Sequence, residues 1–318
     1  MEQHCLFCYK PLEHIEGDYH PRCSKKMFGT VTPPLLPYNE SELDKLALEV
    51  IRSQITIPGV QPKLSLHLAQ DGHLRNPQRF TIVGLWGGYI LKPPSEIYPQ
   101  LPEIEDLTMH LAEAVRIDTV PHCLIRMQSR NLAYLTRRID RSKNGKVHME
   151  DMCQITERLT EEKYNGSYEQ IAKAIRRHSI NPGLDVINFF EMVLFCFLTG
   201  NADMHLKNFS LIDIPEKGGI SLVPAYDMVA TALVTPEDKE ELALTLNGKK
   251  KRITPNDFKK AFDTLSVDEK VQTSIFMKFK KAIPVWNSLI ENSFLDNKMQ
   301  SAYKQLILEK FRQINLMD

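Results

Sequence analysis

A long apolar run constrains the fold of this chain more than any other feature. Residues 185–199 (DVINFFEMVLFCFLT) are almost uniformly apolar and are followed at once by Gly200. The run is shorter than the roughly 20 residues that a membrane span needs, so it predicts a buried core helix that ends at Gly200. The polar residues that follow would form a loop held against a rigid helix, where catalytic residues are often found.

Three side chains in and after this loop form a pattern with a chemical meaning. Asp203 is followed by Asn208 and, nineteen residues later, by Asp227. Protein kinases use one Asp to orient the substrate hydroxyl, and an Asn and a later Asp to bind Mg²⁺. Residues 209–212 and 220–223 predict two short strands, which would return Asp227 to the side of the loop. The alternative is a solvated connection in which these side chains only cap turns.

A second pattern, near residue 60, predicts a site for phosphates. Residues 64–68 (LSLHL) alternate apolar and polar side chains, as half-buried strands do, and the loop PGVQPK precedes them. A short glycine-containing loop before a strand can offer backbone N–H groups to phosphates. The candidates are Gly59, Val60, Gln61 and Lys63, although a single glycine makes neither a Walker A motif nor the usual kinase glycine loop.

A lysine at the end of an apolar strand is the third candidate. The segment WGGYILKPP places Lys92 at that position. Kinases require a strand lysine that contacts the nucleotide phosphates and is braced by a Glu from a helix. Glu103 and Glu105 open the next predicted helix and either could be the brace; we retain Glu105 as the candidate. The alternative is a strand-end lysine whose stem is buried while its ammonium group reaches water.

The motifs together resemble one known family. GVQPKLSL, YILKPP, LTRRIDR, MEDMCQ, KYNGSYEQI, GNADMHLKNFSL and PAYDMVAT occur in the order found in HipA-like kinases, the toxins of bacterial toxin–antitoxin modules. The similarity runs from about residue 45 to near the C-terminus. It implies a two-lobed, kinase-like fold and a serine/threonine protein kinase that uses ATP and Mg²⁺, with aminoacyl-tRNA synthetases among the protein targets of the family.

The resemblance also implies a role for individual residues. Asp203 would be the catalytic base, and His205 would lie in the same catalytic loop. Lys92 would contact the ATP phosphates, and Arg137 with Ile139 would lie along the adenine. Asn208 and Asp227 would bind Mg²⁺.

The chain departs from the best-known members of this family at two places. We expect it to lack their additional N-terminal subdomain, because it resembles the short HipT branch, in which a separate small antitoxin protein supplies that subdomain. A DNA-binding HipB-like antitoxin is the second partner expected. Family kinases autophosphorylate a Ser just before the phosphate loop, where this chain has Thr56, with Ser53 nearby. Phosphate at Thr56 would add about two negative charges beside the nucleotide phosphates, which predicts self-inactivation.

The N-terminus carries a candidate zinc site. Cys-x2-Cys followed by His-x2-Cys provides Cys5, Cys8, His20 and Cys23, the kind of ligands that tetrahedral structural Zn²⁺ prefers. His4 and His14 are spare ligands for the fourth position. The alternative is a reduced, metal-free segment whose cysteines pack as small apolar side chains. The other three cysteines lie within apolar runs and are expected to be buried thiols.

Charge composition favours a cytoplasmic enzyme. Lys+Arg and Asp+Glu are both 40, so the chain has no general attraction to nucleic acid or to membranes. The N-terminus is interrupted by charges and cysteines and does not predict a signal peptide. No membrane association and no direct nucleic-acid binding are expected.

The sequence leaves the roles of three further segments undecided. The basic run at 249–252 is expected to be solvated rather than to bind RNA or an acidic partner. Glu150 and Asp151 could reach the active site or cap the segment that follows them. The segment from Tyr164 through Tyr168, in KYNGSYEQ, could contribute to the substrate face or only shape a loop near the cleft.

We therefore predict an α+β, two-lobed HipA/protein-kinase-like fold. The expected parts are a Cys/His knuckle at 1–28, a proline-rich linker at 29–37, a mostly β N-lobe at 38–136 and a helical C-lobe at 137–318. The predicted function is a growth-arresting toxin kinase that transfers the ATP γ-phosphoryl group to a Ser or Thr of a protein. One alternative is a pseudokinase, an ATP-binding regulator of a DNA-binding partner; a small-molecule kinase is another.

Overall fold

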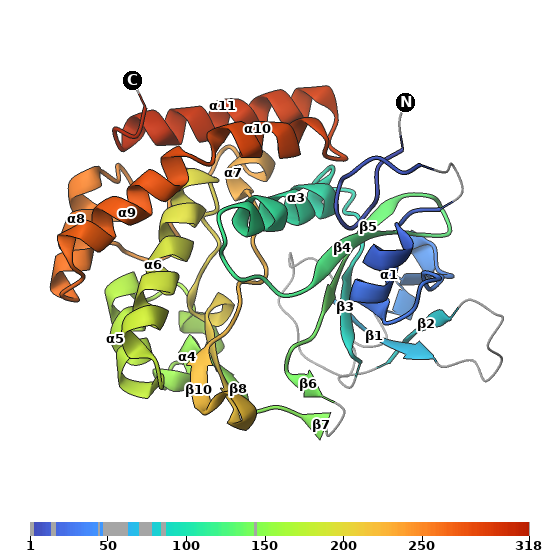
Figure 1. Cartoon of the computed structure of the whole chain (residues 1–318), viewed down its shortest axis with the longest axis horizontal. Helices are drawn as coiled ribbons and strands as arrows, with labels where there is room; N and C mark the ends of the chain where they lie inside the picture. The colour runs from blue at the N-terminus through green and yellow to red at the C-terminus, as the bar shows by residue number, and fades with distance from the viewer. Residues whose placement is uncertain are drawn as a thin grey trace. The chain divides into compact units, whose positions relative to one another are not determined.

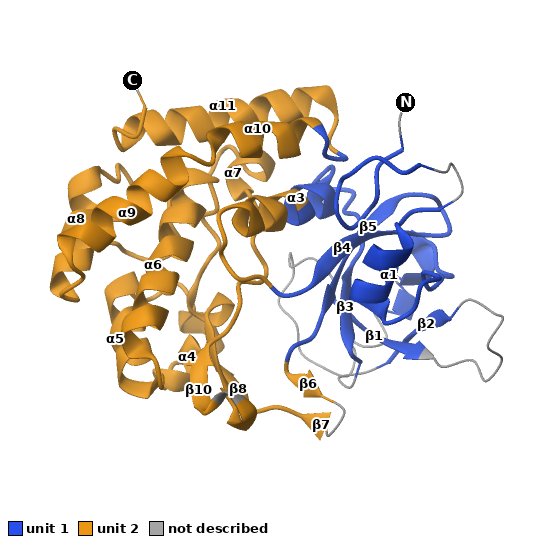
Figure 2. Ribbon diagram, viewed as in Figure 1, with its two compact units in different colours: residues 1–106, 120–139, 292–294 blue, residues 107–119, 140–291, 295–318 orange. Residues whose placement is uncertain are grey.

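The computed structural model divides the chain into two compact units (Figure 2). Unit 1 comprises Met1–Asp106, Val120–Ile139 and Asn292–Phe294, and unit 2 comprises Leu107–Thr119, Asp140–Glu291 and Leu295–Asp318. The structure describes residues 3–13, 17–43, 45–46, 63–69, 78–83, 87–142 and 145–317.

Unit 1 is built on a five-stranded antiparallel sheet with the strand order β2-β1-β3-β5-β4. Its strands are β1 (Leu64–Ala69), β2 (Arg79–Ile82), β3 (Tyr89–Lys92), β4 (His122–Arg126) and β5 (Leu132–Arg137). The register pairs Leu64 with Leu91 and Lys92 with Tyr134. Lys92 therefore ends a strand in the middle of the sheet, where its side chain is buried.

Helix α1 (Pro21–Phe28) packs on this sheet (Figure 1). The Phe28 ring makes edge contacts with Phe80 of β2 and lies 6.4 Å from the Tyr89 ring of β3. The helix ends at Gly29, whose φ of 82° suits a residue without a Cβ atom. Aromatic packing therefore ties the N-terminal segment to the sheet.

The N-terminal residues are not arranged as expected. We expected residues 1–28 to form a separate knuckle joined by a linker at 29–37, but Met27 and Phe28 belong to the same buried apolar cluster as Leu91. The physical reason is that so short a segment cannot enclose a core of its own. It buries its apolar side chains against the sheet instead.

Helix α3 (Leu101–Ala114) contains one of the divisions between the units. We expected lobes at 38–136 and 137–318, whereas the units divide after Asp106 and after Ile139. The second half of the helix belongs to unit 2 because it packs there: the Trp286 indole N–H donates to the Leu111 carbonyl at 2.9 Å.

Unit 2 is mainly helical. Its helices are α4 (Met152–Ile155), α5 (Tyr168–His178), α6 (Pro182–Leu198), α7 (Thr231–Val234), α8 (Pro255–Thr264), α9 (Glu269–Lys280), α10 (Ile283–Glu291) and α11 (Asn297–Gln313). Its short strands are β6 (Arg141–Ser142), β7 (Gly145–Lys146), β8 (Met149–Asp151), β9 (Ser210–Ile214) and β10 (Gly219–Leu222). The last three form an antiparallel sheet in the order β10-β9-β8, and the mixture of sheet and helix is the α+β class that the sequence predicts.

The apolar run forms α6 (Pro182–Leu198), and 11 of its 17 side chains are buried, including every one from Met192 to Leu198. Gly200 follows with φ 67°, and a Cβ atom there would lie 2.8 Å from Leu306 Cδ2 and 2.9 Å from Ala232 Cβ. The chain therefore needs glycine at this position both for its backbone conformation and for close packing. In the part of the chain that the structure describes, no helix is both long and apolar enough to cross a membrane.

Candidate active site

The polar loop between α6 and β9 is fixed by partly buried hydrogen bonds. Asn201 is fully buried, and its Oδ1 accepts the backbone N–H of Asp203 at 3.1 Å. Thr231 Oγ1 accepts the Ala202 N–H at 2.8 Å and donates to the Gly200 carbonyl at 3.2 Å. These hydrogen bonds fix the backbone conformation of the loop at residues 200–203.

Asn208 is bound to the backbone of Asp203. Its Nδ2 donates to the Asp203 carbonyl at 3.0 Å, and its backbone N–H donates to the His205 carbonyl at 3.0 Å. Asn208 is buried. Because the amide nitrogen is used in this bond, the amide oxygen of Asn208 is the atom that can serve as a metal ligand.

The Asp203 carboxylate accepts a hydrogen bond from a tyrosine. Tyr164, in the segment before α5, donates its hydroxyl to Asp203 Oδ1 at 2.5 Å. Burial, followed by the bond to Asp203, raises the pKa of Tyr164 well above its ordinary value. The hydroxyl therefore stays protonated, and it remains a donor to this carboxylate throughout the physiological range.

Cationic and aromatic groups surround the Tyr164 ring. The His205 ring packs edge-on at 4.9 Å between centroids. The ammonium groups of Lys163 and Lys250 lie 5.1 and 5.9 Å from the ring centroid, within cation–π range. The tyrosine is therefore held by its ring as well as by its hydroxyl.

His205 is a buried imidazole whose pKa is lowered from its ordinary value. Burial lowers the pKa of His205, and the positive charge of Lys163 lowers it further, while the carboxylates of Asp203 and Asp227 oppose this shift. Its Nδ1 atom is buried and makes no hydrogen bond to any residue that the structure describes.

Asp227 follows β10 in an uncommon backbone conformation. Its φ is 60°, a left-handed conformation that Asp adopts more readily than most residues but that remains uncommon. The preceding Tyr226 places its hydroxyl 2.6 Å from Ser210 Oγ and donates to the Lys207 carbonyl at 3.0 Å. This hydroxyl therefore attaches the Asp227 segment to the loop, and strained residues of this kind tend to occur at functional sites.

Asp151 has both of the roles that the sequence left open. Its side chain accepts the Gln154 N–H and caps α4 in a capping box. The same carboxylate lies 2.8 Å from the Lys207 Nζ of the polar loop. The Asp151 carboxylate therefore both caps α4 and restrains the polar loop.

Most of the basic run at 249–252 is exposed, as expected, with Lys250 half-buried. Lys249 forms an ion pair with Asp257 at 2.9 Å, and Lys250 lies 3.4 Å from Glu240. Lys250 also approaches Tyr164, as described above. This run therefore contributes one cation to the surroundings of Asp203, which the local sequence did not indicate.

In unit 1, Lys92 and Glu105 form a buried ion pair. Lys92 Nζ lies 2.5 Å from Glu105 Oε1, with side-chain exposures of 5% and 0%, and it also lies 5.5 Å from the Tyr134 ring centroid. Glu103 does not form this pair. Burial instead raises the pKa of Glu103 to about 7, so Glu105 is the carboxylate that braces the lysine.

The remaining nucleotide candidates lie at the edge of the described residues or outside them. Arg137 ends β5, is exposed, and donates from Nη1 to the Lys26 carbonyl at 3.4 Å, and Ile139 follows half-buried. Lys63 is exposed directly before β1. Gly59, Val60, Gln61, Thr56 and Ser53 fall outside the described residues.

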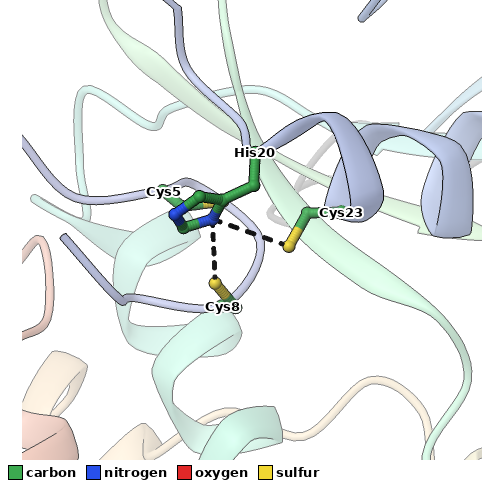
Figure 3. Close-up of side chains that lie close together, drawn as sticks. All are labelled: Cys5, Cys8, His20 and Cys23. Carbon is green, nitrogen blue, oxygen red and sulfur yellow. Dashed lines mark hydrogen bonds between the residues drawn. The ribbon is translucent and has the colours of Figure 1, made fainter. Parts of the chain in front are cut away.

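The four N-terminal ligand candidates lie together (Figure 3). The ligand atoms of Cys5, Cys8, His20 and Cys23 are all within 4.8 Å of one another. The spare candidate His4 instead bonds the Asn292 carbonyl through Nδ1 at 3.0 Å, and His14 falls outside the described residues. All six cysteines of the chain are free thiols, and Cys123, Cys153 and Cys196 are buried as expected.

Some residues of this site were not predicted from the sequence. Tyr164 was noted without a role, while Thr231, Ser210 and Tyr226 were not noted as partners of the loop. Their contacts join segments that are 16 to 39 residues apart. A single sequence carries no signal for such pairs, because hydroxyl groups are common on every kind of surface.

Comparison with known proteins identifies relatives of the chain. Residues 55–286 match the model of the HipA-like C-terminal domain. The chain is 31% identical over 248 residues to a "Putative kinase" of Haemophilus influenzae, a match covering 72% of this chain and 68% of that protein. It is 26% identical over 224 residues to the serine/threonine-protein kinase toxin HipA of Shewanella oneidensis, covering 62% of this chain and 47% of that protein.

A solved structure has the same fold. The chain superposes with a TM-score of 0.70 on a chain of the Shewanella oneidensis complex of HipA, HipB and operator DNA, at 19% identity. The match covers 88% of this chain and 71% of that one. The two-lobed HipA-like fold predicted from the sequence is therefore confirmed, and the matched region spans about half the length of the sequence relative from that organism.

Proposed function

Because the chain belongs to the HipA-like C-terminal domain family, we propose that it is an ATP-dependent serine/threonine protein kinase. The observation that carries this proposal is the loop around Asp203. Its carboxylate already accepts a hydroxyl hydrogen bond, from Tyr164, and its carbonyl is bound to Asn208. A base that accepts one hydroxyl in this way is suited to accept the hydroxyl of a Ser or Thr substrate.

Asp203 would act as the general base. It would orient the substrate hydroxyl and finally take its proton as the oxygen attacks the γ-phosphorus. Tyr164 would act as a positioning residue, because its hydrogen bond to Oδ1 fixes the rotation of the carboxylate. The buried His205 would support this arrangement through its edge-on contact with the Tyr164 ring.

Asn208 and Asp227 would hold Mg²⁺. The residues fit this ion, since hard cations prefer oxygen ligands and the Asn208 amide oxygen is not used in the bond to Asp203. When bound, Mg²⁺ supplies positive charge that offsets the charge of the ATP phosphates. The left-handed conformation of Asp227 would set the direction of its carboxylate.

Lys92 would contact the ATP phosphates, braced by Glu105. A lysine buried among apolar groups needs a carboxylate partner to stay charged, and Glu105 supplies it at 2.5 Å. We propose that Gly59, Val60, Gln61 and Lys63 contribute to the phosphate site, and that Arg137 and Ile139 lie along the adenine.

The proposed biological role is that of a growth-arresting toxin in the cytoplasm. Supporting it are the relative named as a kinase toxin and the solved complex that contains HipB. The target would be a protein, with an aminoacyl-tRNA synthetase as the first candidate. The partners would be a HipB-like DNA-binding antitoxin and a small antitoxin of the kind found in the HipT branch.

Autophosphorylation would limit the activity. Thr56 is the proposed acceptor, with Ser53 as the second. Phosphate at either position adds about two negative charges beside the proposed phosphate loop. Repulsion between this charge and the ATP phosphates would then weaken nucleotide binding.

A non-catalytic ATP-binding regulator is the second candidate. The observation that favours it is that Tyr164 occupies one oxygen of the Asp203 carboxylate. If this hydroxyl blocked the base, the protein could bind ATP and a partner without transferring phosphate. Removal of the Tyr164 hydroxyl would then create phosphoryl-transfer activity. If the protein is a kinase, the same change should lower this activity.

Phosphosite mapping tests the function directly. Purified protein is incubated with Mg²⁺, γ-labelled ATP and a bacterial lysate, beside Asp203→Ala, and phosphosites are identified by mass spectrometry. The proposal expects label on a Ser or Thr of a lysate protein that is absent with the variant. Label found only in a metabolite would support the small-molecule kinase instead, and the absence of all transfer despite ATP binding would support the regulator.

A further inference from the structure

Three thiols and one imidazole converge near the N-terminus, outside the proposed kinase machinery. His20 Nδ1 lies 3.5 Å from Cys8 Sγ and 3.8 Å from Cys23 Sγ, and the Cys5 sulfur lies in the same group (Figure 3). Cys5 is buried, while the other three are half-buried. The four side chains come from two segments, the turn at Cys5–Cys8 and the start of α1.

The spacing of these atoms fits a tetrahedral metal ion. Zinc binds sulfur at about 2.3 Å and imidazole nitrogen at about 2.0–2.1 Å. At a tetrahedral angle, these bond lengths place a nitrogen and a sulfur about 3.5 Å apart, and two sulfurs about 3.8 Å apart. The distances from His20 to Cys8 and to Cys23 are already close to the first value.

The hydrogen bonding of His20 favours metal binding. Its Nε2 lies 3.0 Å from the Pro11 carbonyl, and a carbonyl oxygen can only accept, so Nε2 carries the proton. In the neutral ring, Nδ1 then presents its lone pair to the thiols. A metal-ligating His almost always donates its other ring N–H to a partner of this kind.

We propose that Cys5, Cys8, His20 and Cys23 bind one structural Zn²⁺ and that this ion holds helix α3 in place beside the Lys92–Glu105 pair. A set of three cysteines and one histidine is typical of closed structural zinc sites. The second part of the proposal rests on the proposed kinase function, whereas the metal site does not.

Tyr9 connects the metal site to α3. It directly follows the ligand Cys8 and has a φ of 59°, which an L-residue adopts only when its surroundings enforce it. Its buried hydroxyl donates to Asp106 Oδ2 at 2.8 Å, and His122 Nδ1 lies 2.8 Å from the other oxygen of the same carboxylate. The turn that carries the ligands therefore ends in a buried contact with α3.

Asp106 is the neighbour of Glu105, the partner of Lys92. A shift of the Tyr9 turn would move the first turns of α3, and with them the carboxylate that keeps the buried lysine charged. We therefore expect zinc loss to weaken ATP binding through Tyr9, Asp106 and Glu105, without any contact between metal and nucleotide.

Both segments of the metal site are also tied to the sheet. Leu124 of β4 donates its N–H to the Leu6 carbonyl at 3.1 Å, and Tyr19, next to His20, donates its hydroxyl to the Leu124 carbonyl at 2.5 Å. At the end of α1, the Met27 carbonyl accepts the Tyr89 hydroxyl of β3 at 3.2 Å. A metal ion joining the two segments would therefore fasten α3 to the sheet that carries Lys92.

Metal content tests the first part. Full-length protein is purified from zinc-supplemented medium, and bound Zn and Fe are measured by inductively coupled plasma mass spectrometry. We expect one Zn²⁺ per chain in the wild type and in the control Cys153→Ser, whose cysteine is buried in unit 2, and loss of the metal in Cys8→Ser. Wild-type protein without zinc, or Cys8→Ser with a full equivalent, overturns the site.

Cobalt substitution covers the case in which Cys8→Ser does not fold. Replacement of the bound metal by Co²⁺ in wild-type protein should give the intense visible bands of a tetrahedral ion and a thiolate-to-cobalt charge-transfer band. Weak absorption, typical of octahedral Co²⁺ with oxygen ligands, contradicts ligation by these cysteines. Neither measurement requires kinase activity.

Tyr9→Phe tests the second part. This variant should keep one Zn²⁺ but bind a fluorescent ATP analogue several-fold more weakly, and a zinc-selective chelator should produce the same weakening in the wild type. Unchanged nucleotide affinity in both experiments overturns the coupling while the metal site stands. If the affinity falls as expected but no phosphate is ever transferred, the proposed kinase function fails and the zinc site is unaffected.

Discussion

The Lys92–Glu105 pair of unit 1 and the Asp203–Tyr164 pair of unit 2 show two ways of building a reactive site. The first joins two opposite charges inside the protein, with side-chain exposures of 5% and 0%. The second joins a carboxylate and a neutral hydroxyl at a surface where Tyr164 is 40% exposed. Both pairs have short contacts of 2.5 Å, but the first pair is shielded from solvent and the second is exposed to it.

This difference determines what a substitution should change. Removal of one partner from a buried ion pair leaves a charge without compensation and typically costs about 3–5 kcal/mol of stability. Removal of a neutral donor beside a partly solvated carboxylate lets water take its place, at a cost of about 1 kcal/mol. The buried pair should therefore affect folding and chemistry together, and the surface pair mainly chemistry.

Lys92→Met should have the largest effect on stability. It leaves the buried Glu105 carboxylate without its cation, so we expect the free energy of unfolding to fall by about 3–5 kcal/mol in urea titrations. The control is Lys259→Met, which breaks an exposed pair with Glu269 and should cost at most about 1 kcal/mol. The double variant Lys92→Met/Glu105→Gln should regain much of the stability but bind ATP no better. Equal costs for the two single variants would contradict the comparison.

Gly200→Ala should have the next largest effect. The new Cβ atom would lie 2.8 Å from Leu306 Cδ2 and 2.9 Å from Ala232 Cβ, in a backbone conformation with φ 67°. We expect a loss of about 1–3 kcal/mol, measured by thermal and urea unfolding.

Gly183→Ala is its matched control. Gly183 lies in the first turn of α6, and a Cβ atom there would meet nothing within 4 Å. Alanine is the better helix former by about 1 kcal/mol, so the control should not destabilise the protein. A Gly200→Ala protein as stable as the control would show that the loop does not depend on this glycine.

Glu103 provides a pH test within the same turn of α3 as Glu105. Burial raises the pKa of Glu103 from 4.5 to about 7. Because the folded-state pKa is the higher one, this group favours folding below about pH 4.5, and the contribution is lost as the pH rises through about 7. Glu103→Gln should therefore stabilise the protein more at pH 8 than at pH 5.

Melting temperatures of wild type and Glu103→Gln at pH 5 and pH 8 make this measurement. The exposed Glu96 supplies the control variant Glu96→Gln, for which the difference from wild type should change little with pH. A Glu103→Gln difference that is the same at both pH values would show that this carboxyl is not held in an apolar environment.

Tyr164→Phe should have the smallest effect on stability and a measurable one on rate. Loss of the hydrogen bond to Asp203 should lower kcat several-fold, since the carboxylate can then rotate, and leave KM for ATP and the melting temperature nearly unchanged. Tyr98→Phe, at a partly exposed tyrosine of unit 1, is the control. An increase in kcat would mean that Tyr164 blocks the base, as the regulator alternative requires.

The sequence predicted those parts of the molecule that depend on local patterns. The apolar run gave helix α6, and alternation at 64–68 gave β1. The expected strands at 209–212 and 220–223 correspond to β9 and β10, displaced by one or two residues. Such patterns are visible because burial imposes a period on neighbouring residues.

Contacts between distant segments were less predictable. Which of Glu103 and Glu105 pairs with Lys92 depends on the rotation of α3 about its axis. Whether Tyr164 reaches Asp203 depends on how the segment before α5 packs against the loop. The N-terminal cluster was an exception, because Cys-x2-Cys and His-x2-Cys spacing records a ligand geometry in the sequence itself. Its packing into the core of unit 1 was missed because local spacing says nothing about what surrounds a turn.

Phosphoryl transfer by Asp203→Asn shows whether Asp203 is the general base of a kinase. Wild type, Asp203→Asn and the control Asp213→Asn are compared for binding of a fluorescent ATP analogue and for transfer of label from γ-labelled ATP to protein, their own chains included. We predict that all three bind nucleotide and that transfer by Asp203→Asn alone falls by about 10²–10⁴-fold, the usual contribution of a general base. Transfer at the wild-type rate by Asp203→Asn would contradict the account.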